Sequence, residues 1–488
     1  MNSLKKKHTA FGGRLLIVGF GSIGQGVLPL ILRHVDMPLG KITVLSADDD
    51  GRRAKAEKYG VKFIHKTLTS DNYREVLEPL LSEGDFLLNL SVDVSTHALV
   101  TLCREHGALY LDTCIEPWPG GYDNPELTPS QRSNYLLREE VLPLRDTTGK
   151  YPTALVAHGA NPGLVSLFIK EALLNIARDT GMNIEAPTNR DGWSHLAKDL
   201  GIKVIQIAER DTQASATPKR PDEFVNTWSI FGFYGEGIQP SEMGWGSHEE
   251  VMPFEGARHD FGCQAAIYLD QPGCDTQSRS WTPLAGPFLG YVITHNEAIS
   301  IADYYTVKSN GKNNGRGTAK KPAYRPTVYY AYHPCDAAVI SLREIAAGSG
   351  KLHPKHRLLM EEILPGGIDE LGVLLMGHKK GAYWYGSRLM IDEARKLAPH
   401  NNATSLQVTS SVLAGMVWAM ENPRRGLVET DEIEHERMLE IARPYLGEVL
   451  GVYSDWTPLL GRKPEDNPLF PEDLNFAVPW QFKNFRFS

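Results

Sequence analysis

The sequence has few cysteines, no long apolar run and no excess of positive charge. Its five cysteines, among 488 residues, form no Cys-x-x-Cys pair and are odd in number. This pattern excludes a disulfide framework or a zinc ribbon and predicts buried thiols. No stretch approaches the roughly 20 consecutive apolar residues of a membrane helix. The formal net charge of −8 argues against a general nucleic-acid binder and is compatible with a cationic small substrate.

No cleavable leader is predicted. The basic run Lys5-Lys6-Lys7 precedes a strand pattern, not an apolar stretch with a small-residue cleavage site, so it is predicted to be a solvated tail. The chain is long enough for two or three domains, and no repeat or low-complexity tract is visible. We therefore expect a cytoplasmic protein that binds neither membranes nor nucleic acids.

The first third of the chain alternates between short apolar strands and helices. Strands are predicted at residues 14–19, 41–46, 61–64, 85–92 and 108–113, and helices at 22–34, 72–81 and 97–106. This alternation predicts an α/β fold whose parallel, doubly wound sheet is covered on both faces. Sheets of this kind bind ligands at the carboxyl ends of their strands.

The pattern changes after about residue 150. Residues 153–158 read as a strand, and Asn161 is placed as the N-cap of a helix that has Pro162 at its first position. Strands at 204–208, 226–233 and 290–295 recur between long loops and predict a mostly antiparallel second domain. Residues 310–321 are predicted to be a mobile surface loop, and residues 403–421 a helix.

A glycine-rich loop joins the first strand to the first helix. In Gly19-Phe20-Gly21-Ser22-Ile23-Gly24, the glycines allow a tight turn, a close approach of the backbone to a pyrophosphate, and close packing of helix on strand. The N-terminus of the helix offers free N–H groups to the phosphates. The alternative is a glycine turn without a ligand. We expect a bound dinucleotide that contacts Gly19, Gly21, Ser22, Ile23 and Gly24.

Acidic residues after the second strand favour NAD. Asp48 stands about 24 residues beyond the third glycine, where an acid accepts a hydrogen bond from a ribose hydroxyl. Asp49 and Asp50 would repel a 2′-phosphate, whereas Arg52 and Arg53 keep NADP open.

Polar residues follow the fourth and fifth strands, where the far half of the cofactor would run. Each of them is alternatively an ordinary helix cap. The candidates are Asn89, Ser91, Asp93, Asp112 and Thr113.

Six motifs together resemble one family, the bacterial homospermidine synthases. They are Val-Gly-Phe-Gly-Ser-Ile-Gly-Gln-Gly at 18–26, Asn-Leu-Ser-Val-Asp-Val-Ser-Thr at 89–96, Leu-Asp-Thr-Cys-Ile-Glu-Pro-Trp at 111–118, His-Gly-Ala-Asn-Pro-Gly-Leu-Val-Ser at 158–166, Asn-Thr-Trp-Ser at 226–229 and Thr-His-Asn-Glu at 294–297. The domain order is more distantly similar to saccharopine dehydrogenases and carboxynorspermidine dehydrogenase.

The resemblance implies a domain plan and an activity. Residues 1–152 would form the NAD-binding Rossmann domain, 153–400 an inserted α+β substrate and dimerisation domain, and 401–488 a C-terminal helical segment that packs back on the Rossmann domain. The implied enzyme is a homodimer that keeps NAD bound. It would join two putrescines, or spermidine and putrescine, into homospermidine with release of ammonia or diaminopropane.

Oxidising an amine places clear demands on the site. An alkyl ammonium with a pKa of about 10 is protonated at neutral pH, so a base must remove a proton while carboxylates hold the other ammonium. By the resemblance, Glu116, Glu209 and Glu236 hold or deprotonate the amines, and Asn161 is a polar partner beside both substrate and cofactor. The ordinary alternatives are a loop charge for Glu116, a surface ion pair for Glu209 and a helix cap for Asn161.

Two further residues complete the predicted site. Trp228 would by composition be a core residue, but the resemblance assigns its ring to a cationic imine intermediate. An uninterrupted strand would place Trp228 and Glu236 on one side of the sheet, although Gly232 and Gly235 interrupt it. His295, which is followed by Glu297, could relay protons between the site and water, although a lone histidine is more often structural.

The sequence allows three other interpretations: a metal site, a dehydrogenase and a non-catalytic protein. His353, His356 and His378 suggest a metal, but Pro354 breaks the helix that would align the first two, and we expect none. A saccharopine-type NAD(P) dehydrogenase would need arginines that converge on the pocket. A non-catalytic NAD-binding protein would show no activity that depends on Trp228 or Glu209.

Overall fold

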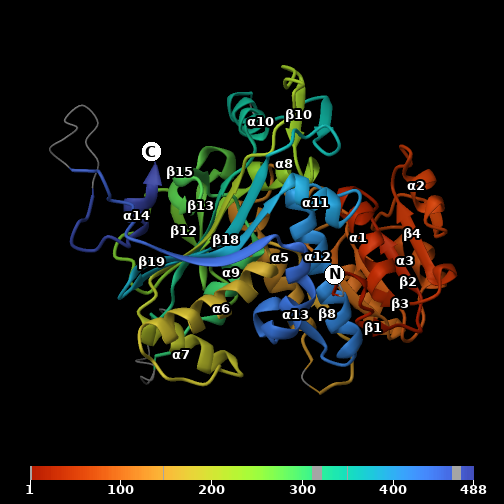
Figure 1. Ribbon diagram of the computed structural model, residues 1–488, viewed down its shortest axis with the longest axis horizontal. Coiled ribbons are helices and arrows are strands. Elements are labelled where there is room, and N and C mark those ends of the chain that lie inside the picture. Colours follow the sequence, from red (N-terminus) through yellow and green to blue (C-terminus); the bar gives the residue numbers. More distant parts are fainter. Residues whose placement is uncertain (1–2, 147, 310–320, 349, 464–473, 488) are drawn as a thin grey trace.

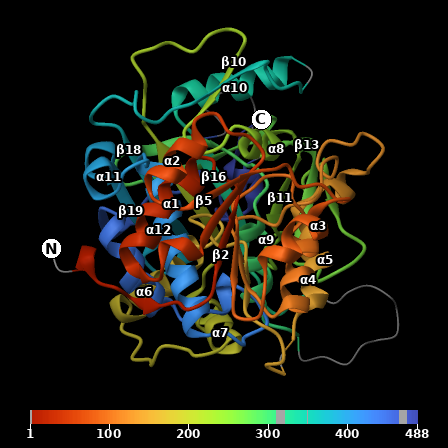
Figure 2. The same cartoon turned by 90° about the vertical axis from the view of Figure 1, so that its right-hand side faces the viewer.

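The computed structural model describes residues 3–146, 148–309, 321–348, 350–463 and 474–487. The loop predicted at 310–321 lies, apart from Lys321, outside the described residues. Two sheets lie side by side, with the N-terminal one at the right of Figure 1 and helix α12 (Ala403–Glu421) between them. In Figure 2 the N-terminal sheet and its helices face the viewer.

The first sheet confirms the predicted doubly wound fold. Its seven strands are all parallel, in the order β20-β8-β7-β6-β2-β4-β5. The chain moves outward from β2 in one direction and then returns to place β6 on its other side, so the strand order reverses there. The strands are β2 (Leu15–Val18), β4 (Ile42–Ser46), β5 (Lys62–His65), β6 (Phe86–Asn89), β7 (Leu109–Asp112), β8 (Ala154–Val156) and β20 (Leu427–Glu429).

Helices α1 (Ser22–His34), α2 (Arg52–Lys58), α3 (Tyr73–Leu77) and α4 (Thr96–His106) connect these strands. The helix predicted at 22–34 is confirmed as α1. The one predicted at 72–81 is shorter, because it changes to a 3₁₀ turn, Glu78–Leu80, at Pro79. A proline has no N–H to donate to the preceding turn.

The second sheet has eleven strands and is antiparallel except where β9 (Val204–Asp211) pairs with β16 (Thr327–His333). On its other side β9 pairs with β18 (Ile368–His378), which continues to β19 (Gly381–Met390) and β21 (Glu448–Ser454). The other members are β11 (Pro240–Gly244), β12 (Gly256–Arg258), β13 (Ala266–Pro272), β14 (Gln277–Thr282), β15 (Gly286–Tyr291) and β22 (Arg486–Phe487). Two short pairs stand apart, β1 (Thr9–Ala10) with β3 (Val35–Asp36) and β10 (Glu223–Asn226) with β17 (Lys355–Leu358).

One face of β9 changes from apolar to acidic along the strand. Alternate residues point to the same face, which carries Ile205 and Ile207 and then Glu209 and Asp211. The two isoleucines belong to the large core that also includes residues of the first sheet and of α12. The acidic end of β9 therefore lies against the region between the two sheets.

Further helices cover the second sheet. Among them α6 (Leu164–Asp179) and α7 (Arg190–Leu200) lie below it in Figure 1, and α10 (Asp336–Ala347) lies above it. The others are α5 (Asn134–Val141), α8 (Phe231–Ile238), α9 (Asn296–Tyr304), α11 (Ile391–Leu397), α13 (His435–Ala442) and α14 (Phe482–Phe485).

The last part of the chain joins both sheets. Helix α12, capped by Asn402, packs between α1 and the second sheet, and β20 extends the first sheet. Strands β21 and β22 extend the second sheet, so residues 401–488 are not helical throughout. Strand β8, which follows the boundary predicted at residue 152, also belongs to the first sheet.

The strand predicted at 226–233 is wrong. Strand β10 ends at Asn226, and residues 231–238 form helix α8. The aromatic residues favour a strand locally, but Phe233 and Gly237 are buried one helical turn apart on α8, so packing decides the conformation. Trp228 and Glu236 therefore do not share a strand face. Similarly, the strand predicted at 290–295 ends at Tyr291.

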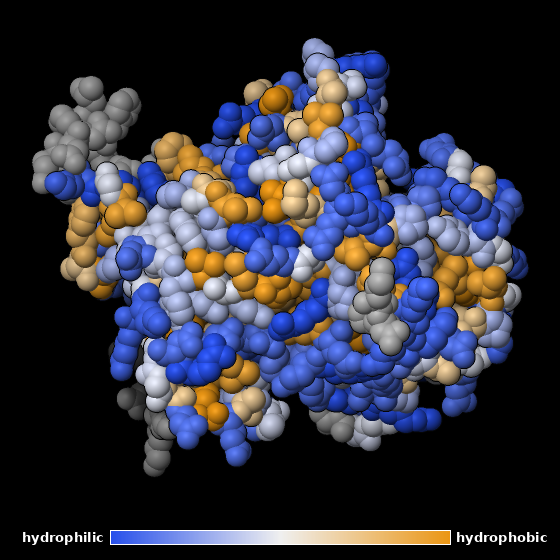
Figure 3. Space-filling model, viewed as in Figure 1, coloured by the Kyte–Doolittle hydropathy of each residue, from blue (hydrophilic) through white to orange (hydrophobic). Residues whose placement is uncertain are grey.

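The exterior is mixed in polarity. Figure 3 shows hydrophilic residues around separate hydrophobic patches on one face. Among the described residues, no helix combines the length and apolar character needed to cross a membrane. The five cysteines are free thiols; Cys103, Cys274 and Cys335 are buried, and the other two are half-buried.

Candidate functional site

The glycine loop leaves room for a ligand at the N-terminus of α1. Gly19 has a φ of +90°, and a Cβ there would lie 2.6 Å from the Leu90 backbone. A Cβ on Gly24 would lie 2.6 Å from the Gly19 carbonyl oxygen, so both glycines serve packing. A Cβ on Gly21 would meet no heavy atom within 4 Å. This open space beside free helical N–H groups fits the pyrophosphate of a dinucleotide.

Gly21 gives a test of this assignment that separates binding from folding. Because its φ is −72° and the space is open, Gly21→Ala should leave the melting temperature of the ligand-free protein nearly unchanged. The added methyl should weaken NAD binding by about 1–3 kcal/mol, or roughly 5- to 150-fold. Calorimetric titration with NAD measures this, and Gly24→Ala, which should instead lower the melting temperature, is the matched control. Unchanged NAD affinity in Gly21→Ala would refute the assignment.

The acids after β4 hold their own arginines. Asp48 is half-buried and pairs with Arg52 at 2.7 Å, and Asp49 pairs with Arg53 at 3.0 Å. With both guanidinium groups paired to acids, the positive charge that a 2′-phosphate requires is offset. The arrangement favours NAD over NADP.

The polar residues predicted along the far half of the cofactor have different environments. Asn89 is buried and accepts hydrogen bonds from the Ser91 hydroxyl and backbone N–H. Asp112 is also buried, and it accepts hydrogen bonds from Thr96, Tyr110 and the Ala157 N–H. The carboxylate of Asp112 is thus used inside the fold.

Ser91 and Thr113 are half-buried, whereas Asp93 is exposed and has a φ of 60°. These three, unlike Asp112, present side chains at the surface that follows β6 and β7.

Glu209 stands at the centre of the predicted substrate site. It is 2% exposed, and its Oε2 accepts hydrogen bonds from Tyr330 Oη at 2.5 Å and Asn161 Nδ2 at 3.2 Å. Burial raises the pKa of Glu209 to about 8, and Asp211 adds to the shift. A surface ion pair, the ordinary alternative for Glu209, is therefore not what the structure shows.

Asn161 is not the N-cap of a helix. Helix α6 begins at Leu164, its N-cap is Gly163, and the Asn161–Pro162 peptide bond is cis. The side chain is thus free to contact Glu209 in the second sheet.

His295 lies between two glutamates. Its Nε2 is 3.1 Å from Glu236 Oε2, and its Nδ1 is 3.1 Å from Glu297 Oε1. Burial disfavours the imidazolium, but the two carboxylates outweigh this and hold the pKa of His295 well above its usual value. Burial also raises the pKa of Glu236. Glu297 is fully buried, whereas the side chain of Glu236 is 14% exposed, so His295 links an interior acid to one nearer the surface.

Glu116 approaches from the first sheet. It follows β7, is 8% exposed, and accepts a 3.4 Å hydrogen bond from the Asp93 N–H. Burial raises the pKa of Glu116 to about 8, and Asp93 and Glu236 both contribute. Glu116 is therefore a buried acid near Glu236, not a loop charge.

Trp228 links the two parts of the site. It lies in the turn between β10 and α8, and its carbonyl oxygen accepts a hydrogen bond from Ser22 Oγ, at the start of α1. Its half-buried ring packs edge-on against Phe233 with centroids 6.0 Å apart. The backbone of Trp228 is thus tied to the dinucleotide loop.

The resulting site is acidic. The ion pairs recorded for Glu116, Glu209, Glu236 and Glu297 within the described ranges involve His295 and no arginine or lysine. Buried carboxyl groups without such partners favour a cationic ligand, because an ammonium offsets their desolvation. A keto-acid substrate would need the opposite charge.

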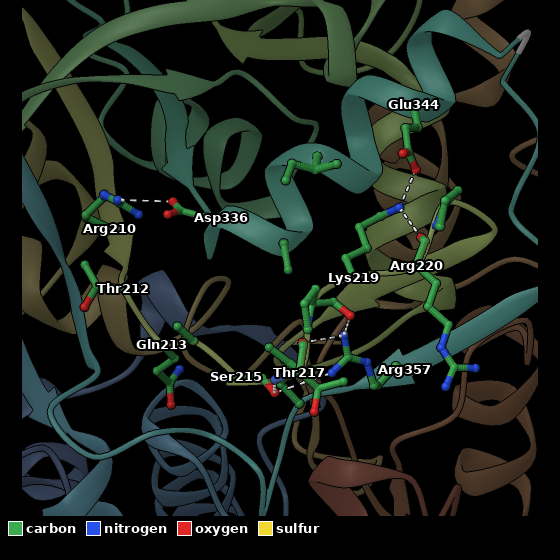
Figure 4. Close-up of a pocket in the computed structure, with 16 residues that line it drawn as sticks. Arg210, Thr212, Gln213, Ser215, Thr217, Lys219, Arg220, Asp336, Glu344 and Arg357 are labelled. Carbon is green, nitrogen blue, oxygen red and sulfur yellow. Dashed lines mark hydrogen bonds and ion pairs between the residues drawn. The ribbon is translucent and has the colours of Figure 1, made fainter.

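A separate cavity of about 440 Å3 lies between the loop that follows β9 and helix α10. Figure 4 shows that three of its cations point at partners: Lys219 at Glu344, Arg210 at Asp336, and Arg357 at the chain near Ser215. None of the predicted site residues lines this cavity.

The histidines considered as metal ligands have other contacts. His353 lies 3.2 Å from Glu344, and His356 contacts the His353 carbonyl oxygen. In the part of the chain that the structure describes, no group of three or more His, Cys, Asp or Glu side chains is arranged to hold a metal.

Four residues beside Glu209 were not predicted. They are Tyr330 and Tyr332 on β16, Asp211 on β9 and Asp369 on β18. The tyrosine pair had a detectable signal, because the two alternate in Tyr330-Ala331-Tyr332 as residues of one strand face do. Asp211 and Asp369 had no such signal in the sequence, because it is the pairing of β9 with β18 that brings them together.

Comparisons with known proteins first define the class. The family model for the saccharopine dehydrogenase NADP binding domain matches residues 15–155. That for the saccharopine dehydrogenase C-terminal domain matches residues 159–452. Yeast saccharopine dehydrogenase shares the fold, with a TM-score of 0.50 at 11% identity over 91% of this chain and 100% of its own.

Closer relatives define the family. Homospermidine synthases from Blastochloris viridis and Mesorhizobium japonicum are 54% and 50% identical, each over 97% of this chain and 97% and 96% of their own lengths. The crystal structure of the homospermidine synthase from Legionella pneumophila in complex with NAD has a TM-score of 0.89 at 47% identity, with 99% of each chain covered. The chain belongs to the homospermidine synthase family.

Proposed function

We propose that this protein is an NAD-dependent homospermidine synthase that transfers an aminobutyl group between polyamines with no net redox change. The observation that carries the proposal is the acidic site itself. In the described part of the chain, the glutamates of this site have no lysine or arginine as an ion-pair partner, and Ser22 of the dinucleotide loop donates a hydrogen bond to the backbone carbonyl of Trp228. Membership of the family supports the same substrates, putrescine and spermidine.

The residues divide into two groups. Gly19, Gly21, Ser22, Ile23 and Gly24 would hold the pyrophosphate, and Asp48 a ribose. When bound, NAD would supply the acceptor for a hydride from the amine-bearing carbon and the donor that reduces the new imine. Its far half would run past Ser91, Asp93 and Thr113, towards Asn161.

On the substrate side, Glu209 would deprotonate the reacting amine, because Asn161 and Tyr330 orient its carboxyl group. Glu116 and Glu236 would hold the distal ammonium. The imidazole of His295 would keep Glu236 in place, and the ring of Trp228 would face the cationic imine.

Three coarser features belong to the same proposal. Residues 153–400 would form the substrate domain, since Asn161, Glu209, Trp228, Glu236 and His295 all come from them. The family resemblance favours a homodimer and a cytoplasmic location.

The test is incubation of the purified protein with putrescine and no added reductant. Homospermidine in the mass spectrum without accumulated NADH absorbance is the expected result. Net NADH with an aminoaldehyde would instead indicate a dehydrogenase, and neither signal would indicate a binding protein.

A further inference from the structure

Three buried carboxyl groups lie on one face of the second sheet. Glu209 and Asp211 alternate on β9, and Asp369 is the partner of Asp211 in the antiparallel register with β18. Their exposed fractions are 2%, 0% and 0%. Of these three acids, the proposed function assigns a role, deprotonation of the reacting amine, to Glu209 alone.

The side chains of Asp211 and Asp369 accept hydrogen bonds from neutral groups. Asp211 accepts hydrogen bonds from the Gln213 N–H at 2.7 Å and from Thr227 Oγ1 at 2.8 Å. Oδ2 of Asp369 accepts from Thr404, whereas its fully buried Oδ1 has no such partner in the described part of the chain.

The register with β18 sets Asp369 opposite Asp211 and diagonally to Glu209 on the same face of the sheet. Burial raises the pKa of Asp369, and both neighbouring acids add to the shift. Because a buried carboxylate oxygen without a donor is costly, whereas a carboxylic acid can donate to a neighbouring carboxylate, this arrangement favours a protonated carboxyl group in the cluster.

The proposed reaction needs groups that take up protons and later return them. Two fully protonated putrescines carry four positive charges, as do homospermidine and ammonium together, so the overall reaction neither releases nor consumes protons. Yet the donor amine must lose one proton before it is oxidised, and the acceptor amine one before it attacks the imine carbon. Two protons are later returned, to the departing ammonia and to the new secondary amine.

We infer that Glu209, Asp211 and Asp369 form a proton-sharing set, in which Glu209 takes a proton from the reacting amine and later returns it. This inference rests on the proposed function. Glu209 would touch the amine, whereas Asp211 and Asp369 are positioning residues that act through Glu209.

The neighbouring groups determine the direction in which each pKa is shifted. Burial and Asp211 raise the pKa of Glu209, whereas the hydrogen bond that Glu209 accepts from Tyr330 and the charge of His295 lower it. The pKa of Asp369 is raised by burial and then by Glu209 and Asp211. Tyr332 and Cys335 also face the set.

The test is the pH profile of homospermidine formation by the NAD-loaded protein. Asp211→Asn removes a negative neighbour of Glu209, and Asp369→Asn removes the group with which Glu209 shares its proton, so in each variant the acid limb assigned to Glu209 should move down by about one pH unit, with KM little changed. Tyr330→Phe removes a donor to the carboxylate and should move the limb upward. Because the two aspartates flank Glu209 on different strands, either variant suffices if the other does not fold.

The matched control is Glu249→Gln. Glu249 is a buried acid whose pKa burial raises to about 7, and it contacts Thr327, at the opposite end of β16 from Tyr332. Its replacement should leave the limb in place. Shifts of the same sign in Tyr330→Phe and Asp369→Asn, or none in either, would overturn the inference.

An infrared readout separates this inference from the proposed function. The infrared spectrum of the wild type at pH 7 should contain the carbonyl band of a carboxylic acid, and this band should shift on transfer to D₂O. The band of the shared acid should weaken in Asp369→Asn and also in Glu209→Gln, because each group holds the proton only beside the other. If the wild type makes no homospermidine, the proposed function fails. If the band weakens in only one of these two variants, proton sharing fails, whatever the activity.

Discussion

Glu209→Gln should lower kcat by about 10²- to 10⁴-fold, the usual contribution of a general base or acid. The amide keeps the volume of the side chain and can still contact Asn161 and Tyr330, but it cannot take up a proton. Rates of homospermidine formation at saturating putrescine measure the effect. The content of bound NAD should stay at the wild-type level, since Glu209 lies on the second sheet.

A matched variant shows whether this loss is chemical or structural. Tyr330→Phe removes one of the two hydrogen bonds to Glu209 but keeps the carboxyl group. It should therefore reduce kcat far less than Glu209→Gln does. A loss of less than about tenfold in Glu209→Gln would remove Glu209 from the role of base.

Trp228→Ala should lower turnover by up to roughly 30-fold, which corresponds to the loss of about 2 kcal/mol of cation–π stabilisation in a desolvated site. The bound NAD should remain, because Ser22 donates its hydrogen bond to the backbone carbonyl of Trp228, which alanine retains. Steady-state kinetics and the absorbance of released cofactor measure the two quantities.

Trp228→Phe is the control, because phenylalanine keeps an aromatic face of the required kind. It should keep more activity than Trp228→Ala. Equal losses in both variants, or loss of NAD in Trp228→Ala, would argue that Trp228 only fills space against Phe233.

The cofactor half of the site could be predicted because its signals are local. The glycine loop, the strand before it and the helix after it are contiguous, and Asp48 follows the next strand. The environment of Asp112 could not be read from the sequence. Its carboxylate accepts hydrogen bonds from Thr96, Tyr110 and the Ala157 N–H inside the fold. The position of an acid at the end of a strand does not indicate whether it contacts a ligand or the protein.

The substrate half could be predicted only through the family resemblance. Glu209 meets Tyr330 and Asp369 because β9 lies between β16 and β18, and no local pattern indicates that strand order. Residues 226–233 illustrate the opposite case. Their aromatic residues favour a strand, but the packing of Phe233 and Gly237 makes residues 231–238 a helix. Asn161 likewise has the sequence of a cap but serves as a contact for Glu209.

We propose that one bound NAD is reduced and reoxidised within each turnover. A labelling experiment tests this with putrescine deuterated on the carbons next to nitrogen, together with an excess of unlabelled free NADH. Homospermidine should retain all of its deuterium, because the transferred atom returns to the carbon from the same cofactor. Homospermidine with one deuterium fewer would show exchange with free NADH and would contradict this proposal.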